Sequence, residues 1–559
     1  MPLERETVPP GHALPPLAAW RGLGAWNAYF IGKMILYATG SLNLDVFYNV
    51  LFAAYLLLPL RPDWLHRARR IVAVPIGIAL LYHDTWYPPF SRLTGRSEVL
   101  QFSFSYIVEL LGRFIDWNMV GAGLIFLVAY LFVSQWLRLT VFSVLALGWL
   151  ALGGLTGISL KWDAAPSATL ADAAAPAAFQ GAAAVAEAQP AAPAALAAKP
   201  TSQQLDGALQ SFFTAESSRR TNFPQALAGG EAPFDIVFLS VCSMAWADLQ
   251  ASGLSTHPLF QNMDLVFDDF NSATSYSGPA ALRLLRANCG QASHEALYRP
   301  ADEHCHLFDS LRRLGFETQA LLNHDGRFPG FVQPLGTVGK FAPPHVPTSL
   351  KPRLRSFDGS PIWGDLDTLS DWWARRQASS GERVALLYNT VTVHDGNREP
   401  LSDGGSRSAP FQTRAQSLLD GFNAFIGELE KSGRRVLVVL IPEHGAGLQG
   451  DRMQIPGMRE IPSRAITRVP VAMRLVGGKA PHGPAVHVQG QTSYLALSEL
   501  IARTLADDLF DRTEIDWKAL ADGLPRTQPV SENEGSVLMS WGETPYVRIG
   551  KGAWIPYPK

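Results

Sequence analysis

The sequence predicts an N-terminal all-α bundle of about five transmembrane spans, followed by an external α/β/α sandwich domain. Three observations lead to this fold class. Residues 1–160 contain long apolar segments with few charges. Residues 161–200 are nearly all Ala and Pro, and residues 201–559 have the composition of a globular protein. We therefore expect a transmembrane domain, an Ala/Pro-rich linker and a C-terminal domain with these limits.

Five apolar segments in the first part of the chain are candidate membrane helices. Crossing a bilayer takes roughly 20 mostly apolar residues, and the segments lie at 22–40, 44–60, 71–87, 118–136 and 139–158. Lys33 weakens the first candidate, and Pro75, His83 and Asp84 weaken the third. The alternative is a buried helical domain, but its helices would each need a polar face, which the last two segments lack.

Basic residues predict the orientation of these spans. The segment from Arg61 to Arg70 is strongly basic, so the positive-inside rule makes it a cytoplasmic loop. Arg138, between the last two spans, agrees with this orientation. Five spans then place the N-terminus inside and everything after residue 160 outside. The polar, proline-containing start of the chain does not have the form of a cleavable signal peptide.

The charge balance and the linker restrict the kinds of partner. The formal net charge is -2 and the isoelectric point about 6.7, so bulk electrostatics do not favour binding to nucleic acid.

In residues 161–200 repeated prolines interrupt helix formation, and few side chains there could form a core. This segment is expected to be a tether that lets the external domain move relative to the membrane.

The chain has three cysteines, which suit an oxidising compartment. Cys289 and Cys305 are close in sequence and could form a disulfide bond, which would stabilise a loop of that size by roughly 3 kcal/mol. Cys242 is then left over. An odd thiol in an exported domain is either buried and inert, or a metal ligand or reactive group.

Short apolar, β-branched runs alternate with helical patterns between residues 230 and 500. The candidate strands are 235–241, 317–323, 384–390, 435–441 and 469–475. Nearly continuous apolar runs of this kind favour a largely parallel sheet that helices cover on both faces. In such sheets the ligand site lies beyond the carboxyl ends of the strands.

Three of the predicted strands end in residues that can bind metal. Cys242 follows the first strand and His394 the third, while Glu443 and His444 follow the fourth. Zn²⁺ accepts sulfur, nitrogen and oxygen ligands in tetrahedral geometry, so this set predicts a zinc site. Each residue taken alone is better explained as a turn residue or a packed side chain.

A candidate nucleophile precedes a predicted helix start. Gly278 and Pro279 followed by good helix formers indicate the first turn of a helix, with Ser277 at or near its N-cap. Free N–H groups at a helix start stabilise an alkoxide and an incoming phosphoryl oxygen. An ordinary capping serine is the alternative, and Thr274 and Ser275 are close enough in sequence to be mistaken for the nucleophile.

The combination of motifs resembles a known family. The domain after residue 200 resembles the alkaline phosphatase/sulfatase superfamily, and the whole chain is similar to the cellulose phosphoethanolamine transferase subunits of bacterial cellulose synthase systems. The motifs that carry this resemblance are Val241-Cys242-Ser243, Ser275-Tyr276-Ser277-Gly278-Pro279, His394-Asp395-Gly396-Asn397, Pro442-Glu443-His444-Gly445 and Gly450-Asp451-Arg452-Met453. The resemblance covers nearly the full length, including the five-span region, and implies a sandwich of alkaline-phosphatase type.

The resemblance also implies roles for individual residues. Ser277 matches the family's nucleophile and is one of its zinc ligands, and Cys289 and Cys305 match a disulfide pair. The other implied ligands are Cys242, Glu443 and His444, and the residues that complete the site are Tyr276, His394 and Arg459. Arginine suits a planar phosphate contact, and from the sequence alone three further arginines compete for that role: Arg452, Arg464 and Arg468.

The function that the resemblance implies is zinc-dependent double displacement. Phosphoethanolamine passes from phosphatidylethanolamine to Ser277 and then to glucose 6-hydroxyls of nascent cellulose, with His394 as the acid/base candidate. The implied location is the bacterial inner membrane, beside the other cellulose synthase subunits, with the catalytic domain in the periplasm. Four tryptophans are candidate stacking faces for the glucan: Trp246, Trp363, Trp372 and Trp373.

Rival functions differ in acceptor or in class. A transferase acting on lipid A or another surface glycan is the nearest enzyme, although exported domains of that family are usually disulfide-rich. A sulfatase or simple phosphatase would leave the membrane region unexplained. A scaffold subunit of a polysaccharide synthase would have no reason to keep the cluster of potential ligands together.

Overall fold

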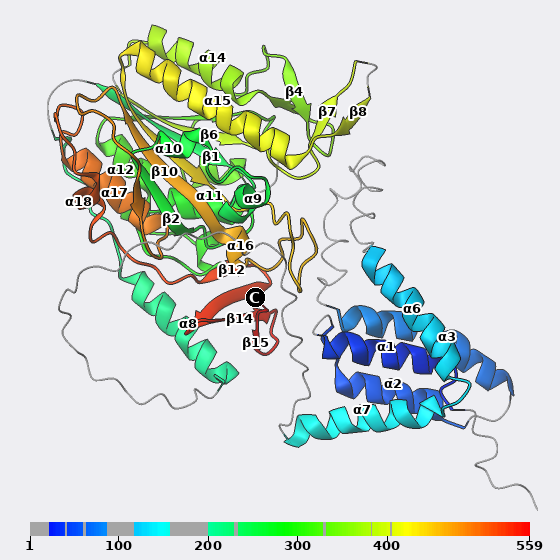
Figure 1. Cartoon of the computed structure of the whole chain (residues 1–559). Coiled ribbons are helices and arrows are strands. Elements are labelled where there is room, and N and C mark those ends of the chain that lie inside the picture. Colours follow the sequence, from blue (N-terminus) through cyan, green and yellow to red (C-terminus); the bar gives the residue numbers. More distant parts are fainter. Residues whose placement is uncertain are drawn as a thin grey trace, which may run out of the picture. The chain divides into compact units, whose positions relative to one another are not determined.

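The computed structural model describes residues 22–39, 42–59, 63–85, 117–156, 199–228, 233–327, 331–381, 383–402 and 405–558. These residues form two compact units (Figure 1). One unit contains the N-terminal helices, and the other contains everything described from residue 199 onward. Almost all of the Ala/Pro-rich linker lies outside the described residues, so the predicted domain limits stay a prediction.

The first unit consists of five helices that follow the predicted apolar segments. They are α1 (Trp26–Ala38), α2 (Val46–Leu57), α3 (Asp63–His83), α6 (Trp117–Val133) and α7 (Leu139–Thr156). Over the described residues, none of the helices combines the length and the apolar character of a bilayer span. The five-span topology therefore stays a prediction.

The basic segment after Arg61 differs from its prediction. From Asp63 onward it is not a loop but the first turns of α3. Leu, Arg and Ala are good helix formers, and nothing between Asp63 and Arg70 interrupts the turn-to-turn hydrogen bonds. The helix also runs through Pro75.

Charged residues that weakened two of the candidate spans pair with each other inside this unit. Lys33 of α1 lies 2.5 Å from Asp84, which directly follows α3, and both side chains are buried. Asn49 of α2 bridges the pair, because it accepts from Lys33 at 2.8 Å and donates to Asp84 at 2.6 Å. Lys33, Asp84 and Asn49 thus form a buried hydrogen-bonded network. Charged groups are tolerated away from water only when they are paired in this way.

The exposed surface of the helical unit is strongly apolar. Large side chains that face outward include Ile78 of α3, Ile125 and Phe132 of α6 and Leu145 of α7, each of them more than half exposed. Soluble proteins rarely expose contiguous apolar surface of this kind, and where it occurs it marks contact with lipid or with another protein.

The second unit is built on a seven-stranded sheet with the order β11-β2-β10-β9-β1-β6-β3. All five predicted strands are present in it. The strands are β1 (Phe234–Val241), β2 (Leu265–Asn271), β3 (Glu317–Leu322), β6 (Val384–Thr390), β9 (Arg435–Pro442), β10 (Arg468–Val476) and β11 (Val486–Val488). β1 lies between β6 and β9, and both pairings are parallel.

Two details of the sheet differ from the prediction. β10 runs antiparallel to both of its neighbours, β9 and β2, although its apolar sequence resembles that of the parallel strands. β2 and β11 were not predicted. β2 contains Asp268 and Asp269 in its middle, which interrupt the apolar run on which strand prediction depends.

Helices cover both faces of the sheet, as Figure 1 shows. One face packs against α11 (Ser277–Leu285), α12 (Leu307–Arg313) and α17 (Tyr494–Ala506), and the other against α9 (Trp246–Ala251), α10 (Pro258–Gln261), α14 (Asp365–Ala378) and α15 (Phe411–Ser432). Along β1, Ile236 and Phe238 face the first layer, whereas Val237 and Leu239 face the second. A strand buried on both sides has no polar face, which explains the continuous apolar runs.

Smaller elements flank this sandwich. One four-stranded sheet contains β4 (Pro352–Arg355), β5 (Pro361–Trp363), β7 (Arg398–Pro400) and β8 (Ser406–Ser408), and a second contains β12 (Ser531–Asn533), β13 (Ser536–Trp541), β14 (Thr544–Ile549) and β15 (Ile555–Pro556). Helix α8 (Ser202–Ser217) packs on the second sheet through Leu205, Leu209 and Phe212. The short helices are α13 (Val332–Thr337), α16 (Arg464–Thr467), α18 (Trp517–Ala521) and two 3-10 turns (Ala296–Tyr298 and Glu303–Cys305).

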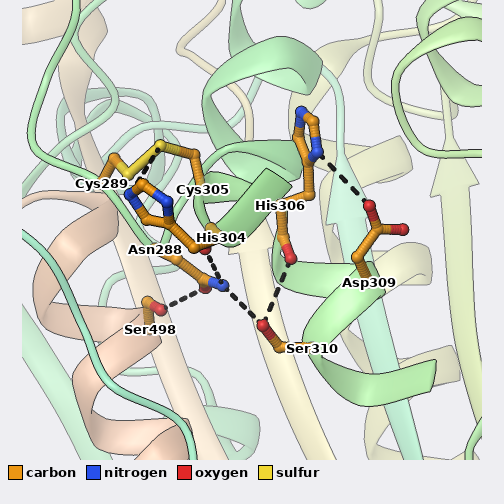
Figure 2. The surroundings of a disulfide bond; sticks show 8 residues. All are labelled: Asn288, Cys289, His304, Cys305, His306, Asp309, Ser310 and Ser498. Atoms are coloured by element: carbon orange, nitrogen blue, oxygen red, sulfur yellow. Dashed lines mark hydrogen bonds and ion pairs between the residues drawn. A yellow bond between two sulfur atoms is a disulfide. The ribbon is translucent and has the colours of Figure 1, made fainter. Parts of the chain in front are cut away.

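The predicted disulfide bond between Cys289 and Cys305 is present (Figure 2). It joins the segment after α11 to the 3-10 turn before α12. Next to it, the buried Asn288 donates to His304 O and to Ser310 Oγ, and accepts a hydrogen bond from Ser498 Oγ. The disulfide bond and these hydrogen bonds together connect α11, α12 and α17 within one layer.

Candidate active site

The register of the three central strands brings the predicted ligands together. Val241, the last residue of β1, pairs with Pro442 of β9 on one side and with Thr390 of β6 on the other. Cys242 and Glu443 therefore leave the sheet at the same level. Backbone hydrogen bonds continue past the strand ends, from Glu443 N to Val241 O and from Cys242 N to Thr390 O.

Cys242, Glu443 and His444 form one compact cluster. Their potential ligand atoms all lie within 4.8 Å of one another, and all three residues are buried. Cys242 Sγ lies 3.8 Å from His444 Nε2. Sulfur, oxygen and nitrogen donors at this spacing form a set that Zn²⁺ accepts.

Ser277 completes the cluster from the helix side. It is the first residue of α11, with Tyr276 as the N-cap, so its position at the helix start agrees with the prediction. Its Oγ lies 3.3 Å from Cys242 Sγ and 3.4 Å from His444 Nε2. The hydroxyl thus lies among the potential metal ligands and beside the free N–H groups of the first helical turn. Thr274 and Ser275 instead bond to groups outside the cluster, to Asn533 and Arg459 O respectively.

Glu443 has one satisfied carboxylate oxygen and one that is not. Oε1 accepts hydrogen bonds from Asn389 Nδ2 at 2.6 Å and from Ser240 Oγ at 3.2 Å. Oε2 is buried, and no hydrogen bond of normal geometry reaches it from the described residues; the Ser277 hydroxyl and the Cys242 thiol lie near enough to the carboxyl group to lower its pKa in part. Burial raises the pKa of this carboxyl group to about 7. A buried oxygen without a donor is costly, and a bound cation would satisfy it.

Burial also shifts the pKa values of the other two cluster residues toward their neutral forms. It raises the pKa of the Cys242 thiol to about 11 and lowers the pKa of His444 well below its ordinary value. His444 Nδ1 lies 2.9 Å from Gly445 O. A proton on Nδ1 leaves Nε2, the nitrogen that faces the cluster, free to act as a ligand.

Arg459 is the arginine that lies at the cluster. Its Nη1 donates to Ser243 Oγ at 3.0 Å and lies 3.2 Å from His444 Nδ1. The competing arginines lie elsewhere: Arg464 pairs with Asp269, Arg468 donates to Asp268 O, and Arg452 is exposed. Ser243 has a φ of +70°, a conformation that is costly for a residue other than glycine and often found at functional sites.

His394 lies near Arg459 on the loop after β6. Burial first, and the charge of Arg459 second, lower its pKa to about 4. The ring is therefore neutral near pH 7, with Nδ1 2.8 Å from Asp395 O. The buried Arg414 fixes this loop, because its Nη1 donates to Thr392 O and His394 O. Tyr276 points its hydroxyl to Glu460 Oε1 at 2.8 Å.

Several residues that support the site were not predicted. Asp248 of α9 accepts hydrogen bonds from Ala245 N, Ala446 N and Leu448 N, so it joins the loop after Cys242 to the loop after His444. The residues around Asp248 in the sequence form no motif that would indicate this role. In the sequence, Asn389 is a polar residue within an otherwise apolar strand, and only this interruption indicates that it could have a role at the site.

The tryptophans do not form an open stacking surface. Trp363, Trp372 and Trp373 are each only 4% exposed, and the last two lie in the core between the sheet and its helices. Trp246 packs against Phe260. The suggested roles of Trp363, Trp372 and Trp373 in glucan stacking are therefore wrong, because a buried ring has no face to offer.

The fold and the site can be compared with those of known proteins. A sandwich with a largely parallel central sheet carries potential metal ligands and a helix-start serine at the carboxyl edge of that sheet. Two solved structures align with part of this chain. A protein in the alkaline phosphatase superfamily from Vibrio parahaemolyticus is 12% identical and covers 63% of this chain and 91% of its own, with a TM-score of 0.45. The C-terminal periplasmic domain of EcEptC from Escherichia coli, in complex with Zn, is 13% identical and covers 61% and 96%, with a TM-score of 0.40.

Sequence comparison identifies the family. Residues 26–152 match the model described as "Cellulose biosynthesis protein BcsG N-terminal domain", and residues 189–554 match "Cellulose biosynthesis protein BcsG C-terminal domain". The protein of that name in Escherichia coli (strain K12) is 45% identical over 545 residues, which are 97% of each chain. Its counterpart in Salmonella typhimurium is 43% identical over 562 residues, which are 100% of each chain. The chain belongs to the BcsG family of cellulose biosynthesis proteins, which confirms the family predicted from its motifs.

Proposed function

We propose that this chain transfers phosphoethanolamine from phosphatidylethanolamine to glucose 6-hydroxyls of nascent cellulose, with Ser277 as the nucleophile. The observation that carries the proposal is the position of Ser277 Oγ, which lies at a helix start and within 3.4 Å of both Cys242 Sγ and His444 Nε2. Membership in the BcsG family supports cellulose as the acceptor.

The residues present fit a zinc ion. Cys242, Glu443 and His444 offer sulfur, oxygen and nitrogen donors at mutual distances below 4.8 Å, and the buried Glu443 Oε2 has no other partner among the described residues. Together with Ser277 Oγ they supply the four ligands of a tetrahedral site. A zinc ion bound there would lower the pKa of the Ser277 hydroxyl and offset the negative charge of the phosphoryl group.

The reaction proceeds in two displacements at phosphorus. In the first, Ser277 Oγ loses its proton and forms a bond to phosphorus, the bond from phosphorus to the diacylglycerol oxygen breaks, and that oxygen takes up the proton that Ser277 lost. In the second, the acceptor 6-hydroxyl loses its proton and forms a bond to phosphorus, the bond from phosphorus to Ser277 Oγ breaks, and Ser277 Oγ takes up a proton. His394, neutral near pH 7, accepts the acceptor's proton, and Arg459 holds a phosphoryl oxygen.

Ser277→Ala tests the proposal directly. We expect the variant to remain folded, since even the loss of a capping hydroxyl costs only about 1 kcal/mol and the N-cap here is Tyr276 rather than Ser277. Transfer should fall by orders of magnitude. Headgroup-labelled phosphatidylethanolamine should label wild-type protein on the peptide containing Ser277, and then label cellulose. An adduct on Thr274 or Ser275, or transfer to lipid A in place of cellulose, would contradict the assignment.

The helical unit is proposed to lie in the bacterial inner membrane, beside the cellulose synthase subunits, with residues 201–559 in the periplasm. Its exposed apolar side chains support contact with lipid, which would keep the catalytic domain near a lipid donor. The Ala/Pro-rich segment 161–200 would act as the tether. Topology reporters fused after residue 66 and after residue 200 should give opposite signals, and equal signals would exclude this arrangement.

A further inference from the structure

We propose that Asn533, on the C-terminal strand β12, is a positioning residue that holds the nucleophile loop and the Arg459 loop together. The inference rests on the function proposed above for Ser277 and Arg459. Asn533 lies more than 250 positions after Ser277 in the sequence, but its side chain is buried against the loop that carries this serine.

The amide of Asn533 bonds to both loops at once. On the nucleophile side, Oδ1 accepts from Thr274 Oγ1 at 3.0 Å and from Ser275 N at 3.2 Å, while Nδ2 donates to Ser275 Oγ at 2.6 Å. On the other side, Nδ2 donates to Glu460 O at 3.0 Å and to Arg459 O at 3.2 Å. The N–H donor and carbonyl acceptors fix which way the amide points, because the reverse orientation would oppose Ser275 N to an NH₂ group.

The loop that Asn533 holds is strained just before it reaches the nucleophile. Ala273 has a φ of +60°, a conformation that persists in a residue other than glycine only where the surrounding structure imposes it. Glu532, the neighbour of Asn533 on β12, donates its backbone N–H to Ala273 O at 3.0 Å. Two successive residues of β12, Glu532 and Asn533, therefore form hydrogen bonds with residues 273–275 and hold them in this conformation.

The second loop places the side chain that faces the cluster. Arg459 directs its guanidinium to Ser243 and His444, while its carbonyl oxygen accepts from Asn533 and from Ser275 Oγ. The amide of Asn533 thus joins the two loops alongside two direct hydrogen bonds between them, from Ser275 Oγ to Arg459 O and from Tyr276 Oη to Glu460 Oε1. Cys242, Glu443 and His444 are not among its hydrogen-bond partners, so its loss should affect the geometry of the reaction more than metal content.

Two substitutions at this position separate hydrogen bonding from packing. Asn533→Ala removes all the bonds, whereas Asn533→Asp keeps the size and the acceptor but cannot donate to the carbonyl groups of Arg459 and Glu460. Asn288→Ala is the matched control (Figure 2), because it removes another buried amide with two donated bonds and one accepted bond, away from the cluster.

The experiment compares kcat and KM for labelled phosphatidylethanolamine in the full-length variants. A displacement of about 1 Å costs about 100-fold in rate, so we expect kcat to fall by that order in both Asn533 variants. Asn288→Ala should lose stability but keep its kcat. Wild-type kcat in Asn533→Asp, or an equal fall in Asn288→Ala, would overturn the inference.

Hydrogen–deuterium exchange provides a readout that does not depend on activity. In both Asn533 variants, the backbone amides of residues 273–277 and 457–461 should exchange faster together, while those of the control should not. Unchanged exchange in these loops would overturn the role of Asn533. A wild-type protein that transfers no phosphoethanolamine would instead refute the proposed function, and the exchange data would still decide whether Asn533 holds the two loops.

Discussion

Replacing Asn389 with Ala should weaken zinc binding without removing any proposed ligand. Asn389 Nδ2 donates to Glu443 Oε1 at 2.6 Å, and this bond fixes the orientation of a carboxylate that belongs to the cluster. Asn389 Oδ1 in turn lies 3.0 Å from His324 Nε2, and His324 Nδ1 accepts from Gly326 N. Burial lowers the pKa of His324 to about 4, so the ring is neutral and donates to Asn389.

The magnitude follows from the type of bond that is lost. A hydrogen bond to a charged group contributes about 1.5–3 kcal/mol, and 1.4 kcal/mol corresponds to a tenfold change in affinity. Loss of the Asn389 bond should therefore raise the Kd for zinc roughly 10–100-fold, the range known for residues that orient metal ligands. Ser240 Oγ still donates to Glu443 Oε1, so binding should weaken rather than disappear.

Competition with a chromophoric zinc chelator measures this change. The control is Asn323→Ala, which removes a buried asparagine directly after β3, the strand paired with β6. The partners of its side chain are Trp363 O, Asp365, Thr392 and Val391 N. None of these is a proposed ligand, so the control should bind zinc with the wild-type Kd. Equal affinities for Asn389→Ala and wild type, or equal losses in both variants, would refute the reasoning.

Two further predictions concern the ligand set and the opposite edge of the sheet. Cys242→Ala should sharply reduce zinc content measured by elemental analysis, and full occupancy in that variant would remove the thiol from the ligand set. Asp235→Ala should lower the free energy of unfolding by about 3–5 kcal/mol, because it leaves the buried guanidinium of Arg376 without its carboxylate. Asp235 lies at the start of β1, so kcat per folded molecule should not change, and a fall in kcat would show that the two edges are coupled.

The strands and the ligand candidates could be predicted because both depend on local patterns. An apolar run such as 435–441 predicts a buried strand wherever it packs, and a polar pair directly after it lies at the strand end by definition. The helix start at Ser277 is equally local, since Gly278 and Pro279 signal it. The predictions failed where packing overrides the pattern: Trp372 and Trp373 have amphipathic rings that suit a surface, but both lie in the core.

Strand order and direction are decided by contacts between residues far apart in the sequence. The apolar sequence of β10 contains nothing that distinguishes an antiparallel strand from a parallel one, because both are buried on two faces. The placement of β1 between β6 and β9 is likewise a long-range result, and it is what brings Cys242 and Glu443 to the same level.

The sequence alone was enough to nominate residues for the site, because thiol, carboxylate, imidazole and hydroxyl groups are properties of residue type, and their positions after strands or before a helix are local. Which of the four arginines faces the cluster, and which residues hold the cluster in place, depended on how the chain packs. Asn533 and Asn389 have no motif around them, and each acts through hydrogen bonds to segments distant in sequence. A hydrogen bond of that kind forms only once the chain has folded, so no local sequence pattern can predict it.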